Sequence, residues 1–340
     1  MRRTLFWASF GWTLGILFLA SGCGGGGNPT PVPLARVAFM GVSSTGDIDI
    51  YVVTLVLGYP TVNVTNHPAM DVHFSWSPSG DQLAFVSNRS GSAELWVIDS
   101  NGANATQLTS DGGSKHSTAW SPNGRWIAYV RNDDIWVYDR KFASSKNLTM
   151  GNGENIEPCW SPSGTQIVFV SDRSGNRDIW VMDASGANLT QLTNTPQEER
   201  RPVWSPNGQK IAFERGTIGW SNIWVMDANG ANQLNLTNSF LGARRHISWS
   251  PDSQSVVYML YNHLYRINVD GTGDFQLTST GSNRRPSWCK SSTGQHFIAF
   301  ERTEAGSNAT GIYYMSPNGG GILGKISGNI GSCMFPEWAP

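Results

Sequence analysis

Short runs of apolar residues, separated by polar turns, recur along most of this 340-residue chain. Each run is about four residues long, rich in β-branched and aromatic side chains, and followed by a stretch in which apolar and polar residues alternate. Runs this short predict strands, because an amphipathic helix needs a pattern of about ten residues or more. No segment after residue 35 has convincing helical periodicity, so we expect an all-β fold. The apolar runs are VAFM (37–40), LAFV (83–86), IAYV (127–130), IVFV (167–170), IAFE (211–214), VVYM (256–259) and IAF (298–300).

A tryptophan precedes most of these runs and gives the period of the repeat. It stands in a Trp-Ser-Pro element at Trp76, Trp120, Trp160, Trp204 and Trp249, and in weaker forms at Trp288 and Trp338. Successive gaps are 44, 40, 44, 45, 39 and 50 residues. A period in the low forties fits a propeller blade of four short strands better than the ~20–34 residues of most solenoid repeats.

The chemistry inside each repeat supports four strands. After the tryptophan, Ser-Pro-x-Gly (as at Ser77–Gly80) places Pro and Gly where a type I turn prefers them, which joins the first strand to the apolar second one. The third strand alternates, as in Ile179–Asp183. Asn-Gly or Ser-Gly turns then lead to a weaker fourth strand that ends in Leu-Thr.

Counting the apolar run gives seven repeats, and the two ends of the chain complete each other. The first run has no Trp-Ser-Pro strand before it, while the last tryptophan, Trp338, has no run after it. We therefore infer that the C-terminal strand supplies the innermost strand of the blade whose other strands come from residues 36–66. Such closure removes exposed sheet edges. The prediction is a seven-bladed β-propeller of four-stranded blades over residues 36–340, with six blades as the alternative.

The repeated pattern P-x-W-S-P-x-G-x-x-I-A-F…I-W-V-M-D-x-x-G-x-N…L-T resembles the TolB-type, WD40-like propeller repeat over about residues 36–340. The resemblance implies an extracytoplasmic binding propeller. Two departures stand out. The TolB protein carries an N-terminal α/β domain, for which we expect no counterpart here, and its propeller has six blades. Lys290 replaces the proline after Trp288, which makes the seventh repeat the least regular.

The N-terminal segment reads as a targeting signal. Arg2 and Arg3 precede an uncharged, mostly apolar run from Leu5 to Ala20, as in a secretory signal peptide. We expect residues 1–22 to be the signal peptide, and the alternative is an uncleaved anchor, because the run is close to membrane-spanning length. Either reading places the propeller outside the cytoplasm.

The end of this segment, Leu-Ala-Ser-Gly-Cys at 19–23, resembles the bacterial lipoprotein cleavage box, which implies that Cys23 carries the lipid. Residues 23–35 would then be the lipidated cysteine and a Gly/Pro-rich tether. By the same resemblance, Gly24 in place of the Asp that retains many lipoproteins at the inner membrane favours the outer membrane. We therefore expect attachment to the cell envelope through a lipid anchor.

Composition limits the remaining possibilities. Charged residues make up only 14% of the chain and the formal net charge is −1, so the basic footprint of a nucleic-acid binder is absent. The other three cysteines (Cys159, Cys289 and Cys333) have no C-x-x-C spacing and indicate neither a metal site nor a disulfide framework. Cys289 and Cys333 should lie in neighbouring blades, which leaves a bridge between them open. We expect a monomer without a cofactor.

One position of the repeat varies in a way that suggests function. The residue three before each tryptophan should lie at the mouth of the central channel, and it favours polar and ionisable types, as expected of a functional surface on a fixed scaffold. The alternative is that these are merely solvated loop residues. In blade order they are Phe335, His73, Ser117, Glu157, Arg201, His246 and Arg285.

Arginine pairs occur near this position in three consecutive repeats: Arg200-Arg201, Arg244-Arg245 and Arg284-Arg285. We interpret them as one basic arc that includes His246, with Glu157, Glu198 and Glu199 at one end. Guanidinium groups bind carboxylates and phosphates bidentately, so an acidic peptide or another anionic ligand is the natural complement. The alternative is that acids of the blades pair with these arginines. Trp220, in a loop expected on the same face, either anchors a partner or folds back over its own blade.

Signatures of catalysis are mostly missing. The chain has no G-x-S-x-G element, P-loop or dinucleotide fingerprint. The alternative function comes from a resemblance to oligogalacturonate lyases, seven-bladed propellers that use channel histidines, a metal and an arginine near an anionic sugar. His73, His116 and His246 could be recruited in this way, but only the first two come from adjacent repeats and no H-x-H spacing supports a metal. The main hypothesis is therefore a non-enzymatic scaffold that binds an envelope protein, an acidic peptide or a saccharide, with no catalytic residue.

Overall fold

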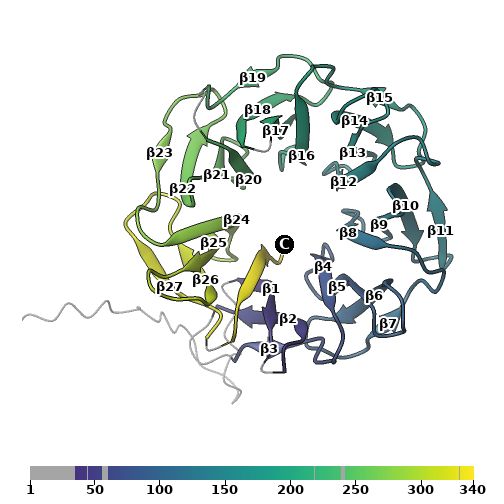
Figure 1. Ribbon diagram of the computed structural model, residues 1–340, viewed down its shortest axis with the longest axis horizontal. Helices are drawn as coiled ribbons and strands as arrows, with labels where there is room; N and C mark the ends of the chain where they lie inside the picture. Colours follow the sequence, from purple (N-terminus) through teal and green to yellow (C-terminus); the bar gives the residue numbers. More distant parts are fainter. Residues whose placement is uncertain (1–34, 44, 56–59, 218, 239–241, 329) are drawn as a thin grey trace, which may run out of the picture. The chain divides into compact units, whose positions relative to one another are not determined.

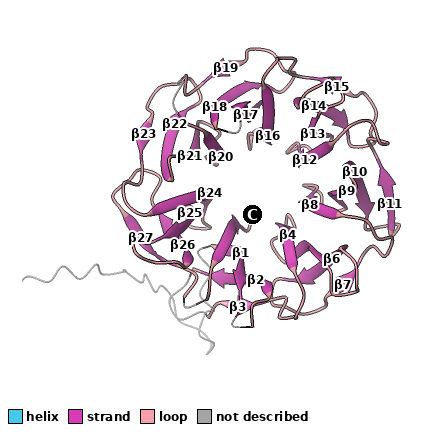
Figure 2. Cartoon of the chain, viewed as in Figure 1, coloured by secondary structure: helices cyan, strands magenta, loops and turns pink. Residues whose placement is uncertain are grey.

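The computed structural model describes residues 35–43, 45–55, 60–217, 219–238, 242–328 and 330–340, which form seven four-stranded antiparallel sheets around a common centre (Figure 1). None of these residues lies in an α-helix (Figure 2). In the same ranges, we find no helix with the length and apolar character needed to span a bilayer. The predicted seven-bladed propeller is confirmed, and the six-bladed alternative is wrong. The predicted signal peptide and Cys23 lie outside the described residues.

Blades are numbered one to seven in chain order. The innermost strands, which line the centre, are β28 (Cys333–Trp338), β4 (Asp71–Trp76), β8 (Lys115–Trp120), β12 (Asn155–Trp160), β16 (Glu198–Trp204), β20 (Arg244–Trp249) and β24 (Ser282–Lys290). The second strands are β1 (Arg36–Val42), β5 (Gln82–Ser87), β9 (Trp126–Arg131), β13 (Gln166–Ser171), β17 (Lys210–Thr217), β21 (Ser255–Leu260) and β25 (His296–Thr303).

The third strands alternate between buried and partly exposed residues. They are β2 (Ile48–Thr54), β6 (Glu94–Asp99), β10 (Asp134–Asp139), β14 (Asp178–Asp183), β18 (Trp220–Asp227), β22 (His263–Asn268) and β26 (Thr310–Met315). The outermost strands are short, which limits the exposed edge of each sheet. They are β3 (Val62–Asn63), β7 (Thr106–Gln107), β11 (Ser144–Asn147), β15 (Thr190–Gln191), β19 (Leu234–Asn235), β23 (Phe275–Gln276) and β27 (Ile322–Lys325).

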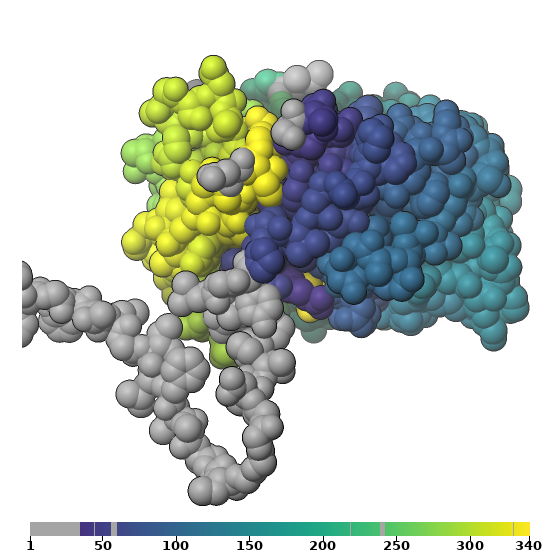
Figure 3. Space-filling view, turned by 90° about the horizontal axis from the view of Figure 1, so that it is seen from below, coloured from purple at the N-terminus to yellow at the C-terminus, as the bar shows by residue number. Residues whose placement is uncertain are grey.

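The ring closes as the sequence predicts. Strand β28 pairs antiparallel with β1, with Val37 opposite Trp338 and Gly41 opposite Cys333. Figure 3 shows C-terminal residues, in yellow, packed against residues near the start of the propeller, in purple. The Nε1 of Trp338 also donates to the carbonyl of Ser287 in blade seven, at 2.7 Å. Blade one is therefore assembled from both ends of the propeller.

Large apolar side chains pack between neighbouring blades and explain the repeat. The repeated tryptophan of each inner strand packs on the preceding blade: Trp76 joins Ala38 and Ile50, for example. The middle of each second strand is a fully buried aromatic, and burying each such ring contributes about 1.5–3 kcal/mol to stability. These aromatics are Phe39, Phe85, Tyr129, Phe169, Phe213, Tyr258 and Phe300.

The described cysteines are free thiols. Cys289 and Cys333 belong to the same core between blades seven and one, yet no disulfide joins them. Burial raises the pKa of Cys289 to about 12 and that of Cys333 to about 11, so both are uncharged at neutral pH and serve as small apolar packing groups.

Candidate functional site

Every inner strand contains a β-bulge at the residue three before its tryptophan. In blade five, Arg201 and Pro202 together oppose the single buried Phe213, because the register shifts between Arg200 and Val203. The bulged residue has a positive φ in all seven blades, from 47° at Arg285 to 60° at His246, although none of the seven is glycine. This left-handed conformation costs about 1 kcal/mol or more for such residues.

The predicted site residues are the bulged residues of the inner strands. The seven residues belong to the innermost strands and not to the loops before them, so the alternative that they are solvated loop residues is wrong. The bulged residues with positive φ are Phe335, His73, Ser117, Glu157, Arg201, His246 and Arg285.

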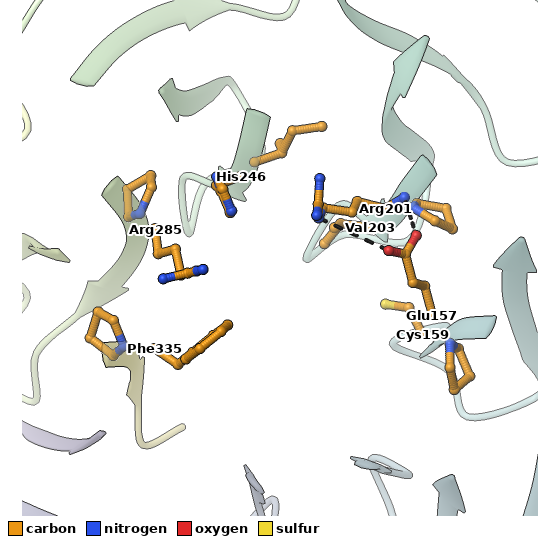
Figure 4. A pocket seen from close by; sticks show the side chains of 12 residues that line it. Glu157, Cys159, Arg201, Val203, His246, Arg285 and Phe335 are labelled. Carbon is orange, nitrogen blue, oxygen red and sulfur yellow. Dashed lines mark hydrogen bonds and ion pairs between the residues drawn. The ribbon is translucent and has the colours of Figure 1, made fainter. Parts of the chain in front are cut away.

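Five of these side chains line one cavity of about 520 Å³, bounded by the inner strands of blades four to seven and blade one (Figure 4). The full lining is Glu157, Pro158, Cys159, Arg201, Pro202, Val203, His246, Ile247, Arg285, Pro286, Phe335 and Pro336. This volume is in the range of sites that hold small molecules or short chain segments. The remaining two bulged residues, His73 and Ser117, come from blades two and three and are not part of this lining.

Arg201 is held between two carboxylates. Its Nη1 donates to Glu214 Oε2 at 2.9 Å, and its backbone N–H donates to Glu157 Oε2 at 2.6 Å. Glu157 Oε1 lies 4.0 Å from Arg201 Nε, which is beyond hydrogen-bonding distance. Glu214 is buried in β17; burial raises its pKa, and the positive charge of Arg201 acts in the opposite direction.

Arg285 has a matching arrangement in blade seven. Its Nη1 donates to both oxygens of Glu301 at 2.8 Å, and Glu301 is buried in β25. Its guanidinium carbon lies 3.9 Å from the centre of the Phe335 ring, a cation–π contact. The N–H of Phe335 in turn donates to Glu301 Oε1 at 2.7 Å. One carboxylate thus fixes a guanidinium of its own blade and the bulged backbone of the next.

His246 lies between the two arginines along the ring. Its N–H donates to Glu214 Oε1 at 2.8 Å, while its ring Nδ1 is buried without a hydrogen-bond partner. Burial lowers the pKa of His246 to about 3, assisted by the positive charges of Arg201, Arg285, Arg245 and Arg284. The imidazole is therefore neutral at pH 7, with one nitrogen that donates and one that accepts.

Sequence reasoning missed the two buried glutamates. Glu214 and Glu301 directly follow the buried aromatic of the second strand, where the other five blades carry Met40, Val86, Val130, Val170 and Met259. The signal was present, because the string IAFER occurs twice, at 211–215 and 298–302. The role of these glutamates is visible only in the structure, where the bulged residue of the next blade, His246 or Phe335, donates its backbone N–H to the carboxylate.

The predicted arginine arc needs a correction, because its three pairs do not share one position. Counted from the tryptophan, Arg244 is five residues away, whereas Arg201 and Arg285 are three away. Arg244 is 6% exposed and occupies a buried polar position of the scaffold. Its counterparts in other blades include Asp71, Lys115, Asn155, Glu199 and Asn283.

The three arginines four residues before the tryptophan differ from one another. Arg200 forms an ion pair with Glu198, and Arg284 donates to the side chain of Asn262 at 3.0 Å. Arg245 is half-buried and acts electrostatically on His246. The alternative that acids of the blades pair with the arc therefore holds for Arg200, Arg201 and Arg285.

The other predicted site residues lie elsewhere. The rings of His73 and His116 are 5.8 Å apart between their centres, in neighbouring blades two and three. Trp220 is half-buried at the start of β18. Glu199 is buried and bonded to Arg215 at 2.6 Å, so it does not flank the cavity. Within the described part of the chain, no cluster of three or more His, Cys, Asp or Glu side chains could hold a metal ion.

Comparison with known proteins places this fold in a family. The family model described as the TolB beta propeller domain matches residues 19–136 and 131–292. The chain belongs to the TolB β-propeller family. A curated relative, the Protein TolB homolog of Chlorobium chlorochromatii (strain CaD3), is 41% identical over 51 residues. That match covers 15% of this chain and 12% of the relative, so it concerns little more than one blade.

Solved structures agree on the architecture. TolB from Acinetobacter baumannii has 18% identity, with 86% of this chain and 79% of the other covered, at a TM-score of 0.55. An oligogalacturonate lyase from Vibrio parahaemolyticus has 13% identity, with 86% and 84% covered, at a TM-score of 0.63. At such low identity, the likeness concerns the fold alone and does not decide between a binding protein and an enzyme.

Proposed function

We propose that this TolB-family protein is a binding propeller of the bacterial cell envelope that holds an anionic group of a partner in its central cavity. The observation that carries the proposal is the placement of Arg201 and Arg285, from blades five and seven, on one cavity with neutral His246 between them (Figure 4). Both guanidinium groups are fixed before a ligand arrives. The partner is an envelope protein segment or a saccharide that carries an acidic group.

The cost of building the site supports a role in binding. Two blades bury a carboxylate where five others bury Met or Val, and desolvating an ion pair is seldom repaid in stability alone. Interactions fixed in advance lose less conformational entropy when a ligand binds.

The experiment that tests the proposal is a calorimetric titration of the purified protein with an acidic peptide and with oligogalacturonate, at low and high salt. We expect binding that weakens as salt rises. Arg201→Gln and Arg285→Gln should each weaken it at least about tenfold, the loss of roughly one charged hydrogen bond. Arg125→Gln is the matched control, because Arg125 also pairs with a carboxylate, Asp139, and is similarly exposed, but lies outside the cavity. Equal affinity of all variants would disprove anionic binding here.

Attachment to the envelope is the second part of the proposal. It rests on the apolar run Leu5–Ala20 and on Cys23 at the end of a lipoprotein-like cleavage box, with residues 1–22 as signal peptide and 23–35 as tether. Cys23→Ser should release the protein from the membrane fraction or leave an uncleaved precursor. A variant that stays with the membranes at mature size would show that another anchor acts. We expect a monomer.

A lyase acting on an anionic sugar is the alternative, favoured by the overall likeness to an oligogalacturonate lyase. The low pKa of His246 makes it a poor general base near neutral pH, which favours binding over catalysis. Incubation with oligogalacturonate separates the two. Appearance of an unsaturated product, lost in His246→Gln, would replace the binding function with the lyase.

A further inference from the structure

The turn between the third and fourth strands of blade three differs from its counterparts in other blades. In blades two, four, five and six, this turn consists mainly of small and polar residues around a glycine with a positive φ, namely Gly102, Gly186, Gly230 and Gly271. Blade three instead carries Arg140-Lys141-Phe142 between β10 and β11. Phe142 is 65% exposed, more than any other Phe, Tyr or Trp side chain in the described ranges. Packing inside the propeller therefore does not explain this aromatic residue.

The exposed ring is held in place by cations. The guanidinium carbon of Arg125 lies 5.3 Å from the centre of the Phe142 ring, and Nζ of Lys141 lies 5.4 Å from it. Arg125 is itself fixed by Asp139, to which its Nη2 donates at 2.7 Å. The backbone N–H of Lys141 donates to the same carboxylate at 2.9 Å. The ring is therefore presented in a fixed position, which lowers the entropic cost of burying it against another surface.

The turn is also basic. Arg125 and Asp139 neutralise each other, whereas Arg140, Lys141 and Lys146 form no ion pair with another described residue. These three side chains belong to exposed residues. Arg140 and Lys146 hydrogen-bond to neutral groups, a glutamine side chain and backbone carbonyls, which leaves their charges in place. Phe142 thus lies among three unbalanced positive charges, which we name the basic turn together with it.

The chain enters the propeller at the same end of the ring. Arg36, the first residue of β1, donates to Ser100 Oγ at 3.0 Å, in the turn that follows β6 of blade two. Arg140 donates to Gln82 Oε1 at 2.9 Å. Gln82 is paired across the sheet with Asp99, the residue before Ser100. Both arginines therefore contact the same end of blade two, which lies between blades one and three (Figure 1).

We propose that the basic turn docks on the anionic lipid bilayer to which the chain is attached, with the Phe142 ring inserted among the headgroups. This inference rests on the attachment proposed above, through Cys23 and the tether of residues 23–35. A Gly-rich tether of this length has an average span of about 20 Å, so the turn stays near the bilayer and a weak contact is sufficient. Each cation close to an anionic surface strengthens the contact about fivefold.

A bilayer suits the basic turn better than a folded protein does. One ring is a small apolar area for a protein interface, which typically buries about 800 Å² on each side. It is sufficient for insertion at a membrane surface when cations surround it. Inner strand β8 also ends beside this turn, because Arg140 donates to the carbonyl of Gly124, four residues after Trp120. The end of the ring at which the inner strands begin then faces away from the bilayer and is free for the partner of the central cavity.

The test measures the environment of the basic turn on the full-length protein in lipid vesicles. A polarity-sensitive fluorophore, nitrobenzoxadiazole, is attached to Ser144→Cys, an exposed position two residues after Phe142. The matched control carries it at Ser90→Cys, which is exposed in the turn at the opposite end of blade two. The protein without an introduced cysteine gives the blank for the other thiols.

The expected result depends on the charge of the lipid. On phosphatidylcholine vesicles with about 30% phosphatidylglycerol, emission from position 144 should rise at least about twofold over that on phosphatidylcholine alone, because the negative surface draws the turn into the headgroups. Emission from position 90 should not change. Salt at about 0.5 M should reverse the rise, because it screens the charges.

Variants in the Ser144→Cys protein connect the rise to named side chains. Phe142→Ser should abolish it, and Lys141→Gln should increase the phosphatidylglycerol fraction needed for half of it. Arg177→Gln removes a positive charge at the opposite end of the ring, in the turn before β14, and should leave the rise unchanged. Thermal unfolding confirms that each variant is folded.

Each outcome has a separate meaning. If emission from position 144 does not depend on phosphatidylglycerol, or rises equally at position 90, the docking proposal is wrong. If Phe142→Ser leaves the rise intact, the ring is not inserted and the proposal again fails. Flotation of the same samples tests the anchor by itself: a protein that does not float with pure phosphatidylcholine vesicles lacks the proposed attachment. Emission from position 144 with excess anionic vesicles still decides the docking in that case.

Discussion

Blades two and three differ from blades five to seven in how neighbouring inner strands are joined. All five blades have the same bulge, a tryptophan three residues after it and a buried aromatic in the second strand. Between blades two and three, the hydroxyl of Thr118 donates to the carbonyl of His73 at 2.6 Å. Between blades five and six, the carboxylate of Glu214 accepts the N–H of His246. The inner strands of blades two and three are therefore joined by a neutral hydroxyl, whereas those of blades five and six are joined by a buried carboxylate.

This difference separates scaffold from site. A neutral link is sufficient for the fold, since Val86 and Val130 fill the positions that Glu214 and Glu301 hold elsewhere. The glutamates are needed only where an arginine must be fixed. The scaffold supplies seven equivalent backbone positions around the centre, and a few substitutions give one part of the wall its charge.

The largest effect should come from removing the strand that closes the ring, which both regions of the wall share. Deletion of residues 333–340 removes β28 and exposes the edge of β1. We expect an insoluble protein or a fall in Tm of more than about 10 °C, since several kcal/mol of packing are lost. The control deletes residues 339–340 only, which costs one backbone hydrogen bond, from Ala339 to Arg36. Equal melting of both truncated proteins would show that the closure is dispensable.

The second largest effect should come from replacing the ion pair of blade seven, Arg285 with Glu301, by neutral residues. Glu301→Val alone leaves Arg285 partly buried without its carboxylate, and we expect a loss of about 3–5 kcal/mol. The double variant Glu301→Val with Arg285→Ser copies the residues of blade three, Val130 and Ser117, and should recover most of that loss while binding of the acidic ligand disappears. Chemical unfolding and calorimetry measure the two properties. A double variant as unstable as the single one would contradict the separation of scaffold and site.

The number of blades and the cavity residues could be predicted from sequence, because every blade repeats the same pattern of a tryptophan in its inner strand and an apolar run in its second strand. Counting three residues back from each tryptophan identifies Arg201, His246 and Arg285. The bulge could not be predicted, because left-handed backbone is usually signalled by Gly or Asn, and here Arg, His, Glu and Phe adopt it. Arg244 is not equivalent to Arg201 and Arg285, because it lies five residues before its tryptophan and they lie three residues before theirs.

The glutamates were missed for a different reason. Glu214 lies 32 residues before His246, and Glu301 lies 34 residues before Phe335. Their partners are backbone N–H groups of the next blade. Almost every residue has a backbone N–H, so the residue type does not show which one a distant carboxylate will bind. Only the three-dimensional contact shows that a carboxylate after a buried aromatic has a partner.

Acid should weaken the charged region selectively. Burial and four arginines hold the pKa of His246 at about 3, below the value of about 6.5 of an unfolded histidine. The unfolded chain therefore binds a proton that the folded one rejects, and this contribution to stability falls as the pH drops from about 6.5 toward 3. Between pH 7 and pH 4.5, the wild type should lose about 2–3 kcal/mol more than His246→Gln. Other titrating groups are common to both proteins, so an equal loss would show that His246 is not held neutral.

The smallest effect should come from the neutral junction. Thr118→Val keeps the shape of the side chain and removes the hydroxyl that joins His73 and accepts from Ser75 Oγ at 3.0 Å. A neutral hydrogen bond contributes about 0.5–1.5 kcal/mol, and water in the centre of the ring can replace part of it. We therefore expect a loss of about 1 kcal/mol in the free energy of unfolding and unchanged binding of the acidic ligand, because Thr118 does not line the cavity. A loss as large as that of Glu301→Val would mean that the hydroxyl and carboxylate junctions are equally demanding, and the comparison between the two regions would no longer hold.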